Sequence, residues 1–145
     1  MRYPVFLELN GQPVTVVGAG KVATRKIRTL LAAGAAVTVI APVATTVLRR
    51  LKSVRWVRRR YKPGDLRGAR LVVVATDDLD VNRKVCAEGK RRRQLVNCAA
   101  PPEAGNFIVP AIVRHGAFTI AISTGGASPS AAKALRQKLE RSLQV

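Results

Sequence analysis

Aromatic residues, cysteines and acidic residues are all scarce in this sequence, and each scarcity limits what the protein can be. Aromatic side chains make up 4% of the residues, so a hydrophobic core has to be built from Val, Ile, Leu and Ala. The two cysteines, Cys86 and Cys98, are too few for a disulfide framework and lack the spacing of metal ligands. We therefore expect reduced thiols, no resident metal ion and a cytoplasmic location.

Long hydrophobic runs are missing as well. No apolar stretch approaches the roughly 20 residues that span a bilayer, and the segment after Met1 lacks the hydrophobic centre of a signal peptide. Hydrophobic residues nevertheless make up 48% of the 145 residues, which is enough for the core of one compact domain. The sequence predicts a protein that has no membrane partner.

The few acidic residues are outnumbered by basic ones, 8 against 26, which gives a formal net charge of +18. Such a charge attracts polyanions, and three uses stay open: a solvated basic surface, attraction of a multiply carboxylated substrate, and nucleic-acid binding. Unpaired bases stack on aromatic side chains, and few aromatic residues lie near the basic runs. Composition therefore disfavours nucleic acid as a partner. The basic runs are Arg49-Arg50, Arg58-Arg59-Arg60 and Lys90-Arg91-Arg92-Arg93.

Short apolar runs rich in β-branched residues alternate with helical patterns through the first two thirds of the chain. Because the predicted strands are continuously apolar, we expect a parallel sheet covered on both faces. The predicted fold class is therefore α/β, a Rossmann-type parallel sheet with helices on both faces. The strands are expected over 14–17, 37–40, 54–57, 71–75 and 95–97, and the helices over 21–33, 43–51 and 80–93.

After Pro101-Pro102 the pattern changes. Extended segments are expected over 106–109 and 118–123, with a turn at 114–116 between them. Ser128 and Pro129 are typical of the N-cap and first residue of a helix, which is expected to run to about residue 143. We divide the chain into a Rossmann domain, 1–109, and a short C-terminal extension, 110–145, that packs on another subunit.

The pattern Gly18-x-Gly20-x-x-Ala23 follows a predicted strand and opens a helix, the setting of a dinucleotide fingerprint. In such a fingerprint Gly18 permits the tight turn, Gly20 lets the backbone approach a pyrophosphate, and Ala23 allows close helix packing. A purely structural glycine turn is the alternative. Ala41-Pro42 stands where an acidic residue usually binds the ribose, so the residues alone leave open NAD, NADP or a fold that has lost its cofactor.

Two further polar segments follow predicted strands. Thr76 and Asp77 lie at the carboxyl edge of the sheet, where they are placed to contact cofactor or substrate; the alternative is that an Asp here caps the next helix. A loop after the strand at 118–123 is a candidate site for substrate carboxylates, and its alternative is a hinge before the last helix. This loop consists of Ser123, Thr124, Gly125 and Gly126.

The chain resembles the precorrin-2 dehydrogenase and sirohydrochlorin ferrochelatase family, that is, the N-terminal region of siroheme synthase. The resemblance spans nearly the whole sequence. It is carried by PVFLEL (4–9), VVGAGKVATRK (16–26), LAAGAAVTVIAP (31–42), ATDD (75–78) with VN (81–82), VN (96–97), FIVPAIV (107–113) and ISTGGASP (122–129).

This resemblance implies NAD-dependent dehydrogenation of precorrin-2 to sirohydrochlorin in siroheme biosynthesis, a branch of porphyrin biosynthesis, with insertion of ferrous iron in some members. It also implies a homodimer built by the chain from about Pro110 onward, and Asn97 at the substrate. Because precorrin-2 carries eight carboxylates, a basic cleft suits it. The residues that the resemblance adds to the NAD site are Lys21, Val22, Pro42 and Val43.

The sequence departs from the family in two places. The family carries an aspartate, active in both reactions, three residues after the Val96-Asn97 pair, and Ala100 stands there in this chain. An alanine neither accepts a proton nor binds iron. The family's C-terminal helical region, which helps to cover the tetrapyrrole, is also missing from the sequence. The alternative function is therefore a catalytically impaired homologue that binds NAD or a tetrapyrrole.

Overall fold

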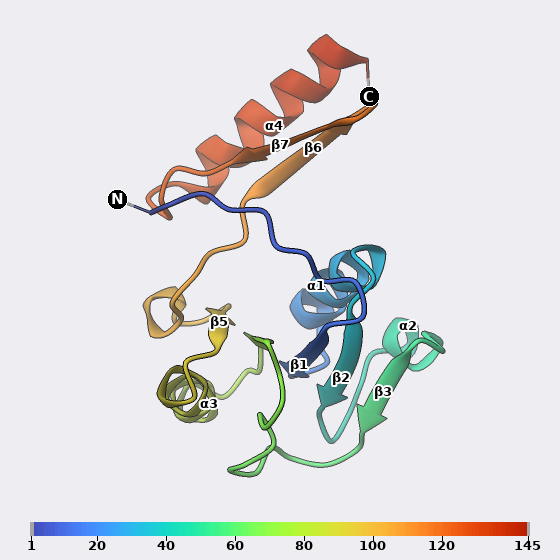
Figure 1. Ribbon diagram of the computed structural model, residues 1–145, viewed down its shortest axis with the longest axis vertical. Coiled ribbons are helices and arrows are strands. Elements are labelled where there is room, and N and C mark those ends of the chain that lie inside the picture. Colours follow the sequence, from blue (N-terminus) through green and yellow to red (C-terminus); the bar gives the residue numbers. More distant parts are fainter. Residues whose placement is uncertain (1, 145) are drawn as a thin grey trace. The chain divides into compact units, whose positions relative to one another are not determined.

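The computed structural model describes residues 2–144 and divides them into two units (Figure 1). The larger unit runs from Phe6 to Phe107. The smaller unit combines the chain up to Val5 with the chain from Ile108 onward. Each unit has a hydrophobic core of its own.

The larger unit is built on a five-stranded sheet in which all neighbouring strands are parallel. The strand order is β3-β2-β1-β4-β5, so the order reverses between β1 and β4, and ligands of such sheets bind at this switch point. The predicted α/β class and all five predicted strands are confirmed. The strands are β1 (Pro13–Val17), β2 (Ala36–Ile40), β3 (Val54–Val57), β4 (Leu71–Val74) and β5 (Leu95–Cys98).

The central strands β1 and β4 are buried on both faces, because alternate side chains of each enter one of two cores. Val16 and Val73 belong to the core beneath α1 (Lys21–Ala32) and α2 (Thr46–Arg49). Val17 and Val72 belong to the core beneath α3 (Leu79–Arg91). Both cores consist mainly of Val, Ile, Leu and Ala, as the scarcity of aromatic residues predicts.

Both cysteines lie in the core beneath α3 and are free thiols. Burial, together with a hydrogen bond to Cys98, raises the pKa of Cys86 to about 12. A thiol with so high a pKa stays protonated at neutral pH and is a poor nucleophile. Cys86 therefore acts as a small hydrophobic side chain of the core, and Cys98 is buried in the same core.

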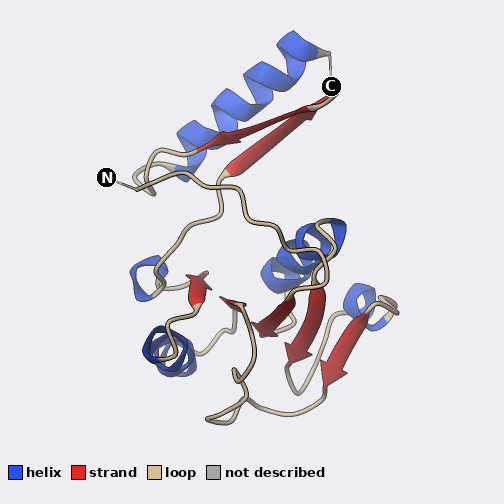
Figure 2. Cartoon of the chain, viewed as in Figure 1, coloured by secondary structure: helices blue, strands red, loops and turns tan. Residues whose placement is uncertain are grey.

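The connection from β3 to β4, residues 58–70, contains no helix and is drawn as loop throughout in Figure 2. It covers the sheet with Leu66, which is fully buried in the core beneath α3. The buried amide of Gln94 fixes it there, because its Nε2 donates to the carbonyl oxygens of Leu66 and Ala69 at 2.6 Å each. This loop takes the place that a crossover helix usually fills.

The smaller unit consists of an antiparallel hairpin, β6 (Ala111–His115) and β7 (Phe118–Ile122), and helix α4 (Pro129–Leu143). The hydroxyl of Ser128 accepts a hydrogen bond from the Ala131 N–H at 3.2 Å, so the predicted N-cap and helix are confirmed. Its core is small and centres on Val113, Ile122 and Ala132. None of the helices within residues 2–144 is long and apolar enough to cross a membrane.

Two expectations about local structure are wrong. The extended segment at 106–109 is no strand, and the strand is β6 instead, which pairs through His115 and turns at Gly116. Its first residue, Asn106, still belongs to the larger unit, where its side chain accepts from the Val96 N–H at 2.7 Å. The helix expected over 43–51 is shorter, and α2 covers only four residues. It starts after Thr45, whose hydroxyl accepts from the Leu48 N–H at 3.2 Å as the N-cap.

Candidate dinucleotide-binding site

The glycine turn after β1 lies against the end of β4, at the switch point of the sheet. The backbone N–H of Ala75 donates to the Val17 carbonyl at 2.9 Å. Gly18 has a φ of +108°, and a Cβ built on it would lie 2.2 Å from the Ala75 carbonyl oxygen. Glycine is therefore required at position 18 by both backbone conformation and packing.

Gly20 has neither of these constraints. Its φ of −79° is open to any residue, and a Cβ built on it would have nothing within 4 Å. The packing of the protein thus gives no reason for a glycine, but the absence of a side chain leaves free space in front of α1. A dinucleotide pyrophosphate fits this position, because its phosphates approach the backbone most closely where no side chain intervenes.

Helix α1 presents a favourable end to an anion. Its N-cap is Gly20, which has no capping side chain, and its first turn contains no acidic residue. The first backbone N–H groups of a helix lack partners within the helix and lie at the positive end of its dipole. Ala23 is fully buried, as the fingerprint predicts, while Lys21 is exposed. The start of α1 therefore offers donors and positive charge to a phosphate.

Two threonines join this turn to the chain after β2. The hydroxyl of Thr24 donates to the Gly20 carbonyl at 2.8 Å and lies 3.0 Å from the hydroxyl of Thr45. The turn is thus fixed to the segment that carries Pro42 and Val43. Sequence reasoning missed both threonines as site residues; the available signal was a Thr one helical turn after the fingerprint glycine.

Large apolar side chains stand in solvent at the same edge. Val22 is 46% exposed, Val43 68% and Leu79 47%, and they follow β1, β2 and β4 respectively. Exposed apolar groups gathered at one edge mark a binding surface, and the rings of a dinucleotide offer flat faces to cover them. The residues that the family resemblance assigns to NAD, Lys21 and Pro42 included, thus come from the start of α1 and from the chain after β2, at one edge of the sheet.

The chain after β4 uses its polar groups mainly for its own structure. The Asp78 carboxylate accepts from two backbone N–H groups in the first turn of α3, at 3.0 Å each, so the helix-capping alternative is confirmed for this residue. The Thr76 hydroxyl donates to the Asn82 side chain at 2.6 Å. Asp77 is exposed beside them. Their contact with a cofactor stays a prediction.

Asn82 links the ends of β4 and β5. It is fully buried, and its Nδ2 donates to the carbonyl oxygens of Thr76 at 3.1 Å and Ala100 at 2.8 Å. Ala100 therefore lies near the β4 loop, at the carboxyl edge. The sequence does not predict this linking role of Asn82. An asparagine inside a helix was the signal, since Asn is disfavoured there unless its side chain has a specific partner.

Asn97, the predicted substrate contact, has its side chain engaged within the larger unit. Its Oδ1 accepts from Lys26 Nζ at 2.8 Å, and its Nδ2 donates to the Phe107 carbonyl at 3.1 Å. Burial lowers the pKa of Lys26 below its ordinary value, and the charge of Arg25 lowers it further. Lys26 was not predicted as a site residue, although it stands one turn from the buried Ala23 on the same helix.

The predicted anion-binding loop belongs to the smaller unit, between β7 and α4. Gly125 and Gly126 have φ values of +70° and +97°. The Ser123 hydroxyl accepts from Gly125 N at 3.0 Å, and the Thr124 hydroxyl accepts from Ser128 N at 2.8 Å. Both hydroxyls therefore close the turn before α4, and the binding of substrate carboxylates stays a prediction.

Comparison with known proteins places these features in a family. Residues 5–111 match the family model described as "Putative NAD(P)-binding", and residues 116–142 match the model described as "Sirohaem biosynthesis protein central". The chain is 42% identical to a siroheme synthase of Chromobacterium violaceum over 95% of its length, and 41% identical to one of Methylobacillus flagellatus over 94%. It spans about 30% of the length of these curated relatives.

A solved structure gives the same result. The chain is 38% identical to "SirC, precorrin-2 dehydrogenase", with a TM-score of 0.87, and the match covers 97% of this chain and 71% of that one. A structure named "TcdA (CsdL)" has a TM-score of 0.51 at 18% identity, a likeness of fold alone. The residues present fit an NAD(P) dinucleotide, and the chain belongs to the family of precorrin-2 dehydrogenases and siroheme synthase N-terminal regions.

Proposed function

We propose that this protein catalyses the NAD-dependent oxidation of precorrin-2 to sirohydrochlorin in the cytoplasm. The observation that carries the proposal is the open glycine at position 20, at the start of α1 and at the switch point of the sheet. It is supported by the 38% identity to a solved precorrin-2 dehydrogenase. The positive net charge suits a substrate with many carboxylates.

In this proposal the chain's own residues bind and orient the reactants. When bound, NAD supplies a hydride acceptor. The first turn of α1 binds the pyrophosphate, while Lys21, Val22, Pro42 and Val43 line the rest of the cofactor. The oxidation removes a hydride and a proton from the tetrapyrrole. Because the methyl group of Ala100 accepts no proton, this proton passes to water or to another base.

The smaller unit is proposed to build a homodimer, with residues 110–145 as the dimerisation extension. A hairpin of two strands is marginally stable by itself, and few residues of this unit are fully buried. Phe118 is 71% exposed and Leu135 48%, and a second copy would cover such apolar surface. Light scattering at micromolar concentration is expected to give the dimer mass, and a monomer mass would contradict it.

The decisive experiment is anaerobic incubation of the protein with precorrin-2 and NAD, followed by the absorbance of sirohydrochlorin. We expect product that depends on both reactants. NAD binding without turnover, together with turnover in Ala100→Asp, would support the impaired-homologue alternative instead. Absence of NAD binding in calorimetry, with a folded protein, would contradict both.

A further inference from the structure

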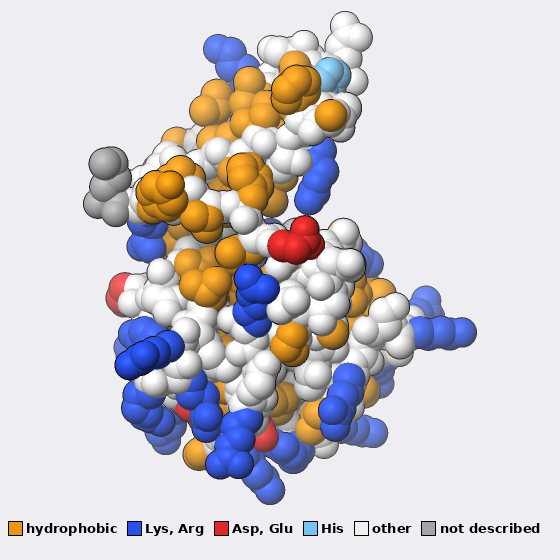
Figure 3. Space-filling view, in the orientation of Figure 1, with side chains coloured by type: hydrophobic (Ala, Val, Ile, Leu, Met, Phe, Trp, Pro, Cys, Tyr) orange, Lys and Arg blue, Asp and Glu red, His pale blue; other side chains and the backbone are white. Residues whose placement is uncertain are grey.

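Basic residues are concentrated in two segments of the larger unit. Residues 49–70 and 83–93 contain 16 of the 26 basic residues but only two of the eight acidic ones. With one exception, Arg59, these basic side chains are exposed. We call them the basic surface. Figure 3 shows Lys and Arg side chains gathered over the region where Figure 1 draws α3 and the chain between β3 and β4.

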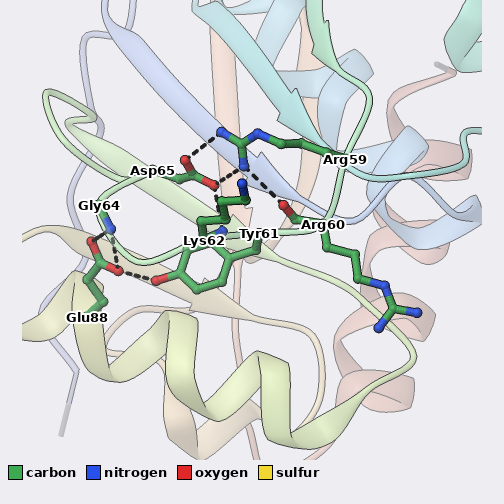
Figure 4. A network of polar contacts seen from close by, with 7 residues as sticks. All are labelled: Arg59, Arg60, Tyr61, Lys62, Gly64, Asp65 and Glu88. Carbon is green, nitrogen blue, oxygen red and sulfur yellow. Dashed lines mark hydrogen bonds and ion pairs between the residues drawn. The ribbon is translucent and has the colours of Figure 1, made fainter.

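The two acidic residues of these segments are bound internally. Asp65 accepts two bonds from the Arg59 guanidinium, at 2.7 and 2.8 Å, and these bonds lower the pKa of Asp65. Glu88 is 4% exposed and accepts from the Tyr61 hydroxyl (Figure 4). It also accepts from Arg92 Nε at 2.8 Å. Both carboxylates thus bind groups of the protein itself, in the β3–β4 connection and α3. The remaining cations face solvent.

A hollow of about 290 Å³ lies within the basic surface. Its arginines come from two elements, the β3–β4 connection and the end of α3, and Glu88 holds one of them, Arg92, in place. Helix α3 starts at the dinucleotide edge, and its thirteen residues extend for about 20 Å, so this hollow is remote from that edge. It is lined by Pro63, Gly64, Arg67, Glu88, Arg91 and Arg92.

The side-chain types favour phosphate as the ligand. Arg outnumbers Lys by 12 to 4 in the two segments, and a guanidinium binds phosphate through two parallel hydrogen bonds, whereas an ammonium acts as a point charge. An array of this size exceeds what a small ligand in one hollow would need. It suits an extended polyanion with regularly spaced phosphates.

The aromatic residues of the two segments decide between single-stranded and duplex nucleic acid. Trp56 already carries the guanidinium groups of Arg49 and Arg58, at 5.9 and 5.7 Å from its ring centroid, and donates its N–H to the Ala41 carbonyl at 2.9 Å. Tyr61 packs in the core with its hydroxyl on Glu88. Neither ring is free to stack on an unpaired base.

We propose that the basic surface binds duplex nucleic acid through its phosphate backbone, independently of base sequence. The scarcity of aromatic residues argues against the stacking of single strands, but phosphate contacts need only cations in a suitable array. This activity goes beyond the proposed dehydrogenation and uses residues remote from the dinucleotide site.

The test measures binding of the whole chain to a fluorescent 20-base-pair duplex by anisotropy between about 50 and 200 mM salt. Arg67→Gln/Arg91→Gln/Arg93→Gln removes three cations of the basic surface and spares Arg92. We expect at least about 30-fold weaker binding at 100 mM salt and a salt slope reduced by about 3. The matched control removes three cations of the smaller unit, Arg114→Gln/Lys133→Gln/Lys138→Gln, and is expected to lose less than about 3-fold.

Three results would overturn the proposal: equal losses in the two triple variants, binding of a single strand as tight as that of the duplex, or displacement of the duplex by polyglutamate at equal charge, which would show that the surface does not select phosphate. NAD affinity, measured on both variants by calorimetry, is expected to stay unchanged. Failure here leaves the dehydrogenase proposal untouched, because that proposal depends on NAD binding and turnover alone.

Discussion

Two polar regions of the larger unit are built in opposite ways. At the dinucleotide edge, the first turn of α1 has no capping side chain, and apolar side chains such as Val22 and Val43 stand in solvent. Where the β3–β4 connection meets α3, the buried Glu88 accepts from Tyr61, Gly64 and Arg92. We call this second region the Glu88 network. Open groups mark where a ligand binds, and satisfied groups mark where the fold needs support.

The Glu88 network has a clear structural task. Because the β3–β4 connection contains no helix, few backbone hydrogen bonds hold it in place. Burial favours the neutral form of a carboxyl group, but the hydrogen bonds from Tyr61, Arg92 and Gly64 outweigh burial and hold the pKa of Glu88 below its ordinary value. A charged carboxylate that accepts several bonds thus replaces the missing helix as the anchor of the loop.

The largest expected effect separates the two glycines of the dinucleotide edge. Gly18→Ala places a Cβ 2.2 Å from the Ala75 carbonyl at a φ of +108°, so backbone strain and overpacking add together. We expect a loss of about 4 kcal/mol in the free energy of unfolding, measured by urea denaturation. Gly20→Ala is the matched control and is expected to cost about 1 kcal/mol or less, since its Cβ meets open space. Similar losses in both variants would contradict the distinction.

The next effect concerns binding rather than folding. Gly20→Asp places bulk and negative charge where the pyrophosphate is expected, while an Asp at an N-cap stabilises a helix. We therefore expect a folded protein whose NAD affinity falls at least about 100-fold, or about 2.7 kcal/mol, by calorimetry. Gly20→Asn separates bulk from charge and should retain more affinity. Unchanged affinity in a folded Gly20→Asp protein would remove the site from this edge.

The two regions also differ in how far the sequence predicts them. The dinucleotide edge is continuous in sequence: a β-branched strand, a glycine turn and a helix follow one another within residues 14–33, so local patterns suffice. The Glu88 network joins residues 27 apart, Tyr61 and Glu88. The Thr24–Thr45 contact likewise spans 21 residues. No local pattern encodes such pairs, because they depend on which elements the fold brings together.

The sequence also does not predict the hydrogen-bond partners of the site residues. Asn97 was expected at the substrate from the family resemblance, and its bond to Lys26 crosses from β5 to α1 over 71 residues. The capping role of Asp78, by contrast, is local and was foreseen as an alternative. Sequence thus predicts elements and caps well, and predicts contacts between elements poorly.

A medium effect tests whether the Glu88 network supports folding. Tyr61→Phe removes the hydroxyl donor and keeps the ring in the core. Since a hydrogen bond to a buried charged group contributes about 2 kcal/mol, we expect a loss of that size in urea denaturation. NAD affinity should stay unchanged. A stability equal to that of the parent protein would show that the hydroxyl contributes nothing to the loop's anchorage.

A smaller effect is expected at the dinucleotide edge. Ala100→Asp restores a carboxylate close to the β4 loop, to which Asn82 ties the carbonyl of residue 100. A positioned acid or base accelerates proton transfer. We expect turnover of precorrin-2 to rise by about ten-fold, or 1.4 kcal/mol in activation free energy, with nearly unchanged NAD affinity. Equal rates of anaerobic sirohydrochlorin formation would mean that another group already moves the proton.

The smallest effect is the pH dependence of the Glu88 network. Because the folded-state pKa of Glu88 is depressed, its contribution to stability is present above the pKa of an unfolded glutamate and is lost as pH falls through the folded-state pKa. Protonation weakens the bonds that the carboxylate accepts, each by about 1 kcal/mol, the difference between a charged and a neutral acceptor. Burial, which favours the neutral form, offsets most of this sum. Glu88→Gln is neutral at every pH. We therefore expect the stability difference between the parent protein and Glu88→Gln to shrink by about 1 kcal/mol between about pH 5 and pH 3.

Urea denaturation at several pH values measures this difference. Tyr61→Phe, which keeps the carboxylate but lacks one donor, should show a smaller part of the same pH dependence. A difference that stays constant down to pH 3 would mean that the charge of Glu88 does not anchor the loop, and the contrast with the open dinucleotide edge would then depend on packing alone.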